Sequence, residues 1–255
     1  MMPCKNIFES EHIMVQEEVP FVDLVRGPYI ISSRNRLTED EATTIVQTLR
    51  RGQDGPEMIP NEVRVLGGRS SSTRCLLPSC GQVFVKHYSH GGLLRSITGG
   101  YFIGSSKSRS AVEFEMLERV RQIGIEAPKP VAIVKKGALL YETWLIMEEL
   151  SDTRSLVDIQ DDEKTLYSAM KGLTTQVLKL VQNKIFHVDL HPGNVLTDSK
   201  DTVYLIDFDK AVIFDGDERL LRDLYLRRWR RAVIKHKLSP IMAEMMALAL
   251  RSHND

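Results

Sequence analysis

The chain has 255 residues, enough for one large domain or for two lobes of about 100 to 150 residues each. Its apolar content of 42% is that of an ordinary globular protein with a sizeable core. Its 34 basic residues balance 34 acidic ones, so no whole-protein field attracts a polyanion such as a nucleic acid, and any basic attraction must be local.

The cysteines and the hydropathy of the chain limit the cellular compartments in which the protein is expected. The three cysteines, Cys4, Cys75 and Cys80, are odd in number and have no C-x-x-C spacing. This pattern argues against a disulfide framework or a zinc site and favours a reducing compartment. No apolar stretch approaches the roughly 20 residues that span a bilayer, and the N-terminus lacks the apolar core of a signal peptide. We expect a protein in the cytoplasm or on the cytoplasmic face of a membrane.

The first third of the chain predicts little beyond local elements. Residues 1–27 are mixed and polar and are assigned only as an N-terminal extension, and residues 28–33 are a predicted strand. Thr38 and Glu41 form a capping box, which apolar residues follow at helical spacing as far as Leu49. Residues 51–60 are rich in glycine and proline and are a predicted loop.

A small-residue turn follows. Val63 and Val65 precede Gly67 and Gly68, and a further apolar run begins at Cys75. A strand, small-residue turn and strand allow backbone N–H groups to approach phosphates, so both glycines are candidate nucleotide contacts. The spacing is not G-x-G-x-x-G, and an ordinary Gly-Gly hairpin turn is an equal alternative.

The next strand ends in a lysine of interest. In residues 81–88, Val83 and Val85 alternate with Phe84 and Lys86, as on a strand with two different faces. Lys86 follows a glycine turn and precedes the H-x-D motif at residues 187–189 by about 100 residues, and in this place it resembles the ATP-orienting lysine of kinases. The alternative is a solvated lysine at the edge of a sheet.

A helix is predicted over residues 106–123, capped by Ser108 or Ser110 and ended by Gly124. Its predicted apolar stripe consists of Val112, Met116, Leu117 and Val120.

The same helix carries acidic candidates, because a lysine that orients ATP needs a carboxylate to hold it. Glu113 and Glu115 are the candidate partners of Lys86. Glu118 is assigned to surface pairing at i,i+4.

Residues 185–210 carry the chemistry. His187 and Asp189 are followed by Asn194, and after an apolar hairpin come Asp207-Phe208-Asp209. Phosphoryl transfer needs a carboxylate to accept the proton of the attacking hydroxyl, and Asp189 fits that role. Mg²⁺ prefers oxygen ligands, which Asn194 and Asp207 offer. The alternative is two hairpins with ordinary acidic turns.

The C-terminal segment contains two predicted helices, over residues 217–237 and 240–250. After an acidic first turn, the first helix carries Asp223 as its one acid beside these basic residues: Arg219, Arg222, Arg227, Arg228, Arg230, Arg231, Lys235 and Lys237. Such a local excess on a neutral chain favours binding to anionic headgroups or phosphate. A merely solvated helix face is the alternative.

These motifs resemble known families. The pattern H-x-D-x-x-x-x-N followed by D-F-D resembles the catalytic and metal-binding loops of the protein-kinase-like superfamily. Several other stretches resemble the bacterial lipopolysaccharide kinases, and their 3-deoxy-D-manno-octulosonic acid (Kdo) kinase branch in particular, over residues 60–238. They are residues 83–88 (VFVKHY), 90–93 (HGGL), Glu113-Phe114 with Gly124 and residues 128–130 (PKP), 187–194 (HVDLHPGN), 206–210 (IDFDK) and 224–231 (LYLRRWRR).

The resemblance implies an α+β, protein-kinase-like fold of two lobes: an antiparallel-sheet N-lobe at residues 28–149 and a reduced, mostly helical C-lobe at residues 150–255. Lys86 would orient ATP and Glu113, which precedes an aromatic residue, would hold it. Backbone groups of Glu148 to Leu150 would hold adenine.

The implied reaction transfers the ATP γ-phosphate to an inner-core sugar on a lipid A precursor, with Asp189 as the catalytic residue and Asn194 and Asp207 holding Mg²⁺. The implied location is peripheral, on an anionic surface at the cytoplasmic face of the inner membrane. The replacement of D-F-G by D-F-D removes a glycine hinge and argues against an in/out flip of that loop. The oligomeric state is left open.

Two alternatives stand beside this hypothesis. Another small-molecule phosphotransferase, such as a core heptose or aminoglycoside-type kinase, would share the catalytic motif but not the basic tail. A pseudokinase would be expected to lack Lys86, Asp189 or Asp207, all of which are present.

Overall fold

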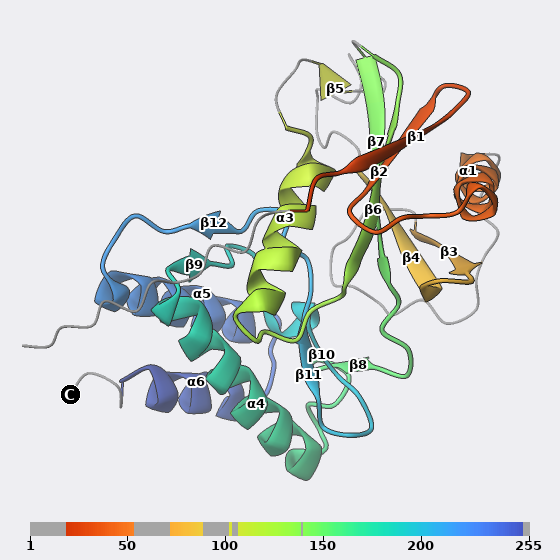
Figure 1. Ribbon diagram of the computed structural model, residues 1–255. Helices are drawn as coiled ribbons and strands as arrows, with labels where there is room; N and C mark the ends of the chain where they lie inside the picture. Colours follow the sequence, from red (N-terminus) through yellow and green to blue (C-terminus); the bar gives the residue numbers. More distant parts are fainter. Residues whose placement is uncertain (1–18, 54–71, 89–101, 104–106, 139, 252–255) are drawn as a thin grey trace, which may run out of the picture.

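The computed structural model describes residues 19–53, 72–88, 102–103, 107–138 and 140–251. In this part of the chain an antiparallel sheet precedes a mostly helical half, with helix α3 (Arg109–Gln122) lying between the two (Figure 1). The predicted α+β class is therefore confirmed.

The larger sheet is antiparallel throughout. Its strands follow the order β1 (Val22–Arg26), β2 (Tyr29–Ser33), β6 (Pro130–Lys136), β7 (Leu140–Glu148), β4 (Gly81–Tyr88) and β3 (Ser72–Leu77), and the short β5 (Phe102–Ile103) pairs with the start of β7. β1 lies within the stretch assigned as an N-terminal extension, and Gly27, at φ +58°, sits in its hairpin with β2. The predicted boundary at residue 27 is therefore wrong, because residues 22–26 belong to the sheet.

Helices cover both faces of this sheet. Alternate side chains of β7 enter different cores: Trp144 and Ile146 pack with helix α1 (Glu39–Gln53), while Leu145 and Met147 pack with α3. Because side chains alternate along a strand, a strand covered on both faces is buried at successive positions. The sheet is therefore the wall between two apolar cores, and the core on the α3 side continues into the helical half.

Both predicted helices of this half form, with local differences. The capping box closes as expected, since the Thr38 amide donates to Glu41 at 2.9 Å and the Glu41 amide donates to Thr38 Oγ1 at 3.2 Å. α1 extends to Gln53, so the predicted loop from residue 51 starts too early, and residues 54–60 lie outside the described part. Val112 is 37% exposed and does not belong to the apolar stripe of α3, which Phe114 completes instead.

The second half is built on three helices. They are α4 (Glu163–Gln182), α5 (Glu218–Lys235) and α6 (Ile241–Arg251), and the side chains of all three meet in one core. The short elements between α4 and α5 are β9 (Ile185–Phe186), the 3₁₀ turn η1 (Pro192–Asn194), β10 (Val195–Thr197), β11 (Val203–Leu205) and β12 (Val212–Ile213), and β8 (Arg154–Ser155) pairs with β10. Among the helices of the described residues, none is both long and apolar enough to cross a bilayer.

Candidate active site

Alternation along β4 decides where Lys86 points. Val83 and Val85 are buried against α1, so Lys86 lies on the opposite face of the strand, toward α3. There its Nζ donates to both carboxylate oxygens of Glu113, at 2.8 and 3.1 Å, and to Asp207 Oδ1 at 2.5 Å. Burial lowers the pKa of Lys86, but the charges of Glu113 and Asp207 outweigh burial and raise it overall. Lys86 is therefore a charged, held side chain and not a solvated edge lysine.

Glu113 is the buried centre of this network, with only 1% of its side chain exposed. Besides Lys86, it accepts hydrogen bonds from the hydroxyl of Tyr88 and from the backbone amide of Phe208, the latter at 3.1 Å. Burial and the Glu113 charge raise the pKa of Tyr88 well above its usual value, so its hydroxyl keeps the proton that it donates. One carboxylate thus joins the sheet, α3 and the D-F-D segment.

The other two glutamates of α3 have different partners. Glu115, the alternative partner for Lys86, pairs with Lys107 at 2.8 Å on the surface. Glu118 binds Arg34 Nε at 2.9 Å, far along the chain. The choice of Glu113 as the contact of Lys86 is confirmed.

The segment after β9 presents Asp189 while burying His187. The His187 ring is fully inside, with Nε2 at 2.9 Å from the Ile206 carbonyl and its centre 4.4 Å from that of the Phe208 ring. Burial lowers the pKa of His187, which fits a neutral, structural ring. The side chain of Asp189, by contrast, is 33% exposed. Asn194 Nδ2 donates to the Asp189 carbonyl at 3.0 Å and so holds the turn from Asp189 to Asn194.

Asp189 lies among carboxylate oxygens and close to the Asn194 side chain. The Asn194 amide is oriented by its donor nitrogen, which leaves Asn194 Oδ1 buried without a hydrogen-bond partner in the described part of the chain. One carboxylate oxygen from each of Asp189, Asp207 and Asp209 lies within 4.8 Å of the others. Burial opposes ionisation of Asp207, yet the Lys86 charge holds its pKa below the usual value. Carboxylate oxygens and an orphaned amide oxygen suit a hard cation such as Mg²⁺.

The D-F-D segment is held from several sides. Asp207 has a φ of +66°, in the left-handed region where non-glycine residues are uncommon. Phe208 is fully buried. Asp209, at the position where D-F-G has its glycine, pairs with Arg109 of α3. These contacts give Asp209 a clear structural partner and tie the segment to α3.

The predicted nucleotide contacts are only partly described. The amides of Glu148 and Glu149 already donate to the carbonyls of Lys129 and Gln82, at 2.8 and 3.0 Å. If an amide of this segment binds adenine, that role therefore falls to Leu150. Gly67 and Gly68 lie outside the described residues.

Sequence reasoning missed three side chains of this site. Tyr88 lies two positions after Lys86 and so shares its strand face, a signal that was available. Arg109, which pairs with Asp209, and Lys210, which donates to Asp189 Oδ2, carry no local pattern that singles them out.

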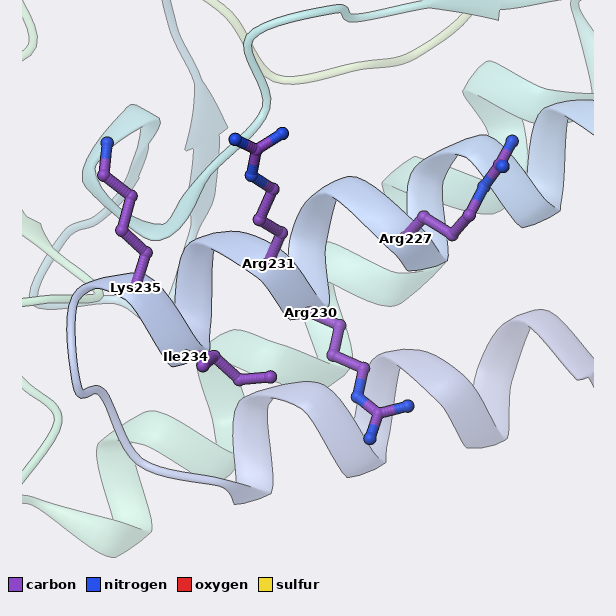
Figure 2. A pocket seen from close by; sticks show the side chains of 5 residues that line it. All are labelled: Arg227, Arg230, Arg231, Ile234 and Lys235. Carbon is purple, nitrogen blue, oxygen red and sulfur yellow. The ribbon is translucent and has the colours of Figure 1, made fainter.

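The basic helix α5 is capped by Asp217, which was predicted to lie in its first turn, and presents its cations on different sides. Arg227, Arg231 and Lys235, four residues apart, project from one side of α5, whereas Arg230 points toward α6 (Figure 2). With Ile234 these four line an open groove of about 410 Å³. We call Arg227, Arg231 and Lys235 the α5 row.

This helix is also attached to the catalytic segment. The Tyr225 hydroxyl accepts a hydrogen bond from the His187 amide and donates to the Ile185 carbonyl, both at 2.8 Å. α5 also packs against the 3₁₀ turn η1, which follows Asp189 in the chain, so the helix lies near the catalytic segment.

Comparison with known proteins agrees with this geometry. A sequence model of the "Lipopolysaccharide kinase (Kdo/WaaP) family" matches residues 64–240. A protein of Vibrio cholerae serotype O1 named "3-deoxy-D-manno-octulosonic acid kinase" is 32% identical over 168 residues, covering 64% of this chain and 71% of that protein. Proteins of the same name from Vibrio vulnificus and Stenotrophomonas maltophilia are each 29% identical, covering 60% and 66% of this chain and 69% and 71% of their own lengths.

Proposed function

Because this chain belongs to the lipopolysaccharide kinase (Kdo/WaaP) family, we propose that it transfers the γ-phosphate of ATP to a hydroxyl of Kdo on a lipid A-linked core. The protein is a phosphotransferase acting on an alcohol group, and the names of its relatives specify Kdo as the acceptor for those proteins. The observation that carries the proposal is the meeting of Lys86, Glu113 and Asp207 from distant parts of the chain beside Asp189 and Asn194.

Asp189 is the proposed base. Its side chain is a third exposed and can meet a substrate, whereas Glu113 is enclosed by protein donors. The acceptor hydroxyl gives its proton to Asp189 while its oxygen forms the new bond to phosphorus. The bond from that phosphorus to the bridging oxygen breaks, and ADP leaves with the electron pair.

Asn194 Oδ1 and the Asp207 carboxylate are the proposed metal ligands, since one is a buried orphan acceptor and the other is held ionised. A bound Mg²⁺ would supply neutralisation of phosphate charge. Lys86, fixed by Glu113, would orient the phosphates of ATP.

We further propose that the sheet with α3 is the nucleotide-binding lobe and that residues 150–255 are the catalytic lobe. With β1 included, the first lobe begins near residue 22 and ends near residue 149, where β7 leads out of the sheet. Gly67, Gly68 and Leu150 remain proposed nucleotide contacts, and Glu148 would contribute through its carbonyl.

The acceptor assignment is tested by mass spectrometry. The purified protein is incubated with ATP, Mg²⁺ and either lipid A bearing Kdo alone or lipid A bearing Kdo and heptose. We expect a gain of one phosphate on Kdo in both acceptors. Phosphate on heptose alone, or on neither sugar, would contradict the proposal, and an Asp189→Asn variant provides the blank.

We also propose that the α5 row docks the enzyme on the anionic inner-membrane surface that carries its acceptor. Arg231 and Lys235 are exposed and have no ion pair in the described part of the chain, and Arg227 adds a third charge to the same side. Basic residues near an anionic membrane contribute about 1 kcal/mol each. Three such charges on one side of a helix attached to the catalytic segment would hold the active site near the lipid.

The docking test uses vesicles containing anionic phospholipid at low salt. Replacing Arg227, Arg231 and Lys235 by Gln should weaken vesicle binding and activity on the lipid-linked acceptor but leave ATP affinity unchanged. Arg228 is left intact because its guanidinium lies 5.7 Å from the centre of the Phe186 ring and contributes to packing. A matched control replaces three exposed lysines, Lys164, Lys171 and Lys200, by Gln. Equal vesicle binding by the two triple variants would refute docking through α5.

A further inference from the structure

Lys210 lies in the candidate active site, but the mechanism proposed above assigns it no role. It lies three residues after Asp207, in the turn where the Ala211 amide donates to the Phe208 carbonyl at 3.0 Å. Its Nζ donates to Asp189 Oδ2. Hydrogen bonding to Asp189 raises the pKa of Lys210, and the charges of Asp189, Asp209 and Asp207 add to this effect against burial. A charged ammonium therefore sits against the proposed base.

Each carboxylate of the acidic cluster has its own cation. Asp207 contacts Lys86, Asp209 contacts Arg109, and Asp189 contacts Lys210. The three pairs differ in constraint.

Lys86 is held by two carboxylates and its side chain is only 17% exposed, which leaves it little freedom. The side chain of Lys210 is 56% exposed, and among the described residues its one ion pair is with Asp189. A lysine has a flexible stem with rotatable donors, so Lys210 can turn without disturbing the fold.

The pair also leaves room for a substrate. Lys210 occupies one oxygen of Asp189, Asn194 binds the Asp189 backbone carbonyl and not its side chain, and the carboxylate remains a third exposed. While Lys210 donates to one oxygen, it orients the Asp189 carboxylate and leaves the second oxygen for a substrate. A hydroxyl that approaches from solvent would meet an oriented carboxylate beside a positive charge.

From this geometry we propose that Lys210 is a further catalytic residue: it orients Asp189 before transfer and binds the transferring phosphoryl group during it. This inference rests on the proposed function. When the acceptor proton moves to Asp189, that carboxylate becomes neutral and its attraction for Lys210 falls. Negative charge is at that moment shared among the phosphoryl oxygens and the departing ADP. The ammonium, released by one anion, neutralises the next without gaining or losing a proton itself.

The test compares Lys210→Met with Lys210→Arg, in the full chain, on ATP and Kdo-bearing lipid A. Met keeps the length and apolar stem but removes the charge, and Arg restores a charge. We expect kcat to fall roughly 100-fold in Lys210→Met, the scale of removing one preorganised group that stabilises transition-state charge. The KM for ATP should change little, and Lys210→Arg should recover at least part of kcat.

Lys200→Met is the matched control, because Lys200 is an exposed lysine in the β10–β11 turn, outside the acidic cluster. It should keep the wild-type kcat. Thermal unfolding of all variants separates catalysis from folding.

A Lys210→Met enzyme with kcat within about threefold of wild type would overturn the inference. So would a joint loss of kcat and thermal stability that Arg does not restore, since that marks a purely structural tether. If the wild-type protein itself phosphorylates no Kdo, the failure lies in the proposed function and not in the role of Lys210.

Discussion

The interior network around Glu113 and the α5 row both contain charged side chains, but they differ in how far those side chains are buried and paired. In the interior network, Lys86, Glu113 and Asp207 have exposed side-chain fractions of 17%, 1% and 34%, and Lys86 and Glu113 each have at least two protein partners. In the α5 row, Arg231 and Lys235 are exposed, without an ion pair among the described residues. The first region is fixed before any ligand arrives, while the second has its charge available for one.

This difference in burial decides how strongly the charges of each region interact. A buried charge interacts strongly because little water screens it, but it tolerates the loss of a partner badly. An exposed charge interacts weakly, and salt weakens it further. In the proposed function, the interior network positions the phosphates of ATP and the α5 row supplies attraction at long range. The following experiments test that division.

The largest effect is expected at Asp189, the proposed base. Asp189→Asn removes the proton acceptor while nearly preserving shape, so turnover should fall about a hundred- to ten-thousand-fold. ATP affinity, measured by titration calorimetry, should stay close to that of wild type, because Asp189 is not a proposed ligand of the nucleotide. Wild-type turnover in this variant would refute its role as base.

The second effect concerns stability and compares two glutamates of one helix. Glu113→Gln removes the charge that faces Lys86 and Tyr88 in the interior, and breaking a buried pair in this way costs about 3 to 5 kcal/mol. Glu115→Gln removes only the surface pair with Lys107 and should cost less than about 1 kcal/mol. Urea unfolding measures both. Equal losses would show that the network is not the special region that its burial suggests.

The third effect concerns the metal. Asn194→Ala and Asp207→Ala should each weaken Mg·ATP binding at least roughly tenfold, which corresponds to about 1.4 kcal/mol for one oxygen ligand. Titration of ATP without Mg²⁺ is the internal control, because there the Asn194→Ala variant should match wild type. Unchanged Mg·ATP affinity in both variants would make these residues turn formers only.

The smallest effect per residue is expected in the α5 row and depends on salt. Raising NaCl from about 0.01 to 0.3 M shortens the screening length from roughly 30 Å to well under 10 Å. Vesicle binding by the wild-type protein should fall at least tenfold over this range. The stability difference between wild type and Glu113→Gln should change by less than about 0.5 kcal/mol, since that network is buried. If vesicle binding ignores salt, the row does not dock by charge.

The sequence predicted the elements whose apolar residues recur at the short periods of a strand or a helix. Strand alternation placed Phe84 and Lys86 on one face of β4, and helical spacing located α3 and α5. The choice of Glu113 over Glu115 needed the resemblance to a family, since spacing on α3 favoured neither.

What could not be predicted depends on contacts between distant residues. Arg109 and Asp209 are 100 positions apart, and Lys210 and Asp189 are 21 apart. A local sequence pattern therefore cannot indicate that either pair forms. β1 was missed for a different cause. Val22 and Val25 are both more than half exposed, so the strand shows no buried face for periodicity to reveal. Its place comes from backbone pairing with β2.

The hydrogen bonds of Tyr225 have a consequence for how a substrate is chosen. One side of α5 carries the row, about 12 Å long at the helical rise of 1.5 Å per residue, and Tyr225 bonds the backbone that leads to Asp189. A membrane surface bound by the α5 row, as proposed, would then fix the height and orientation of the Asp189 carboxylate above that surface. If α5 docks as proposed, the distance of each sugar from the surface would help to decide which hydroxyl reaches Asp189.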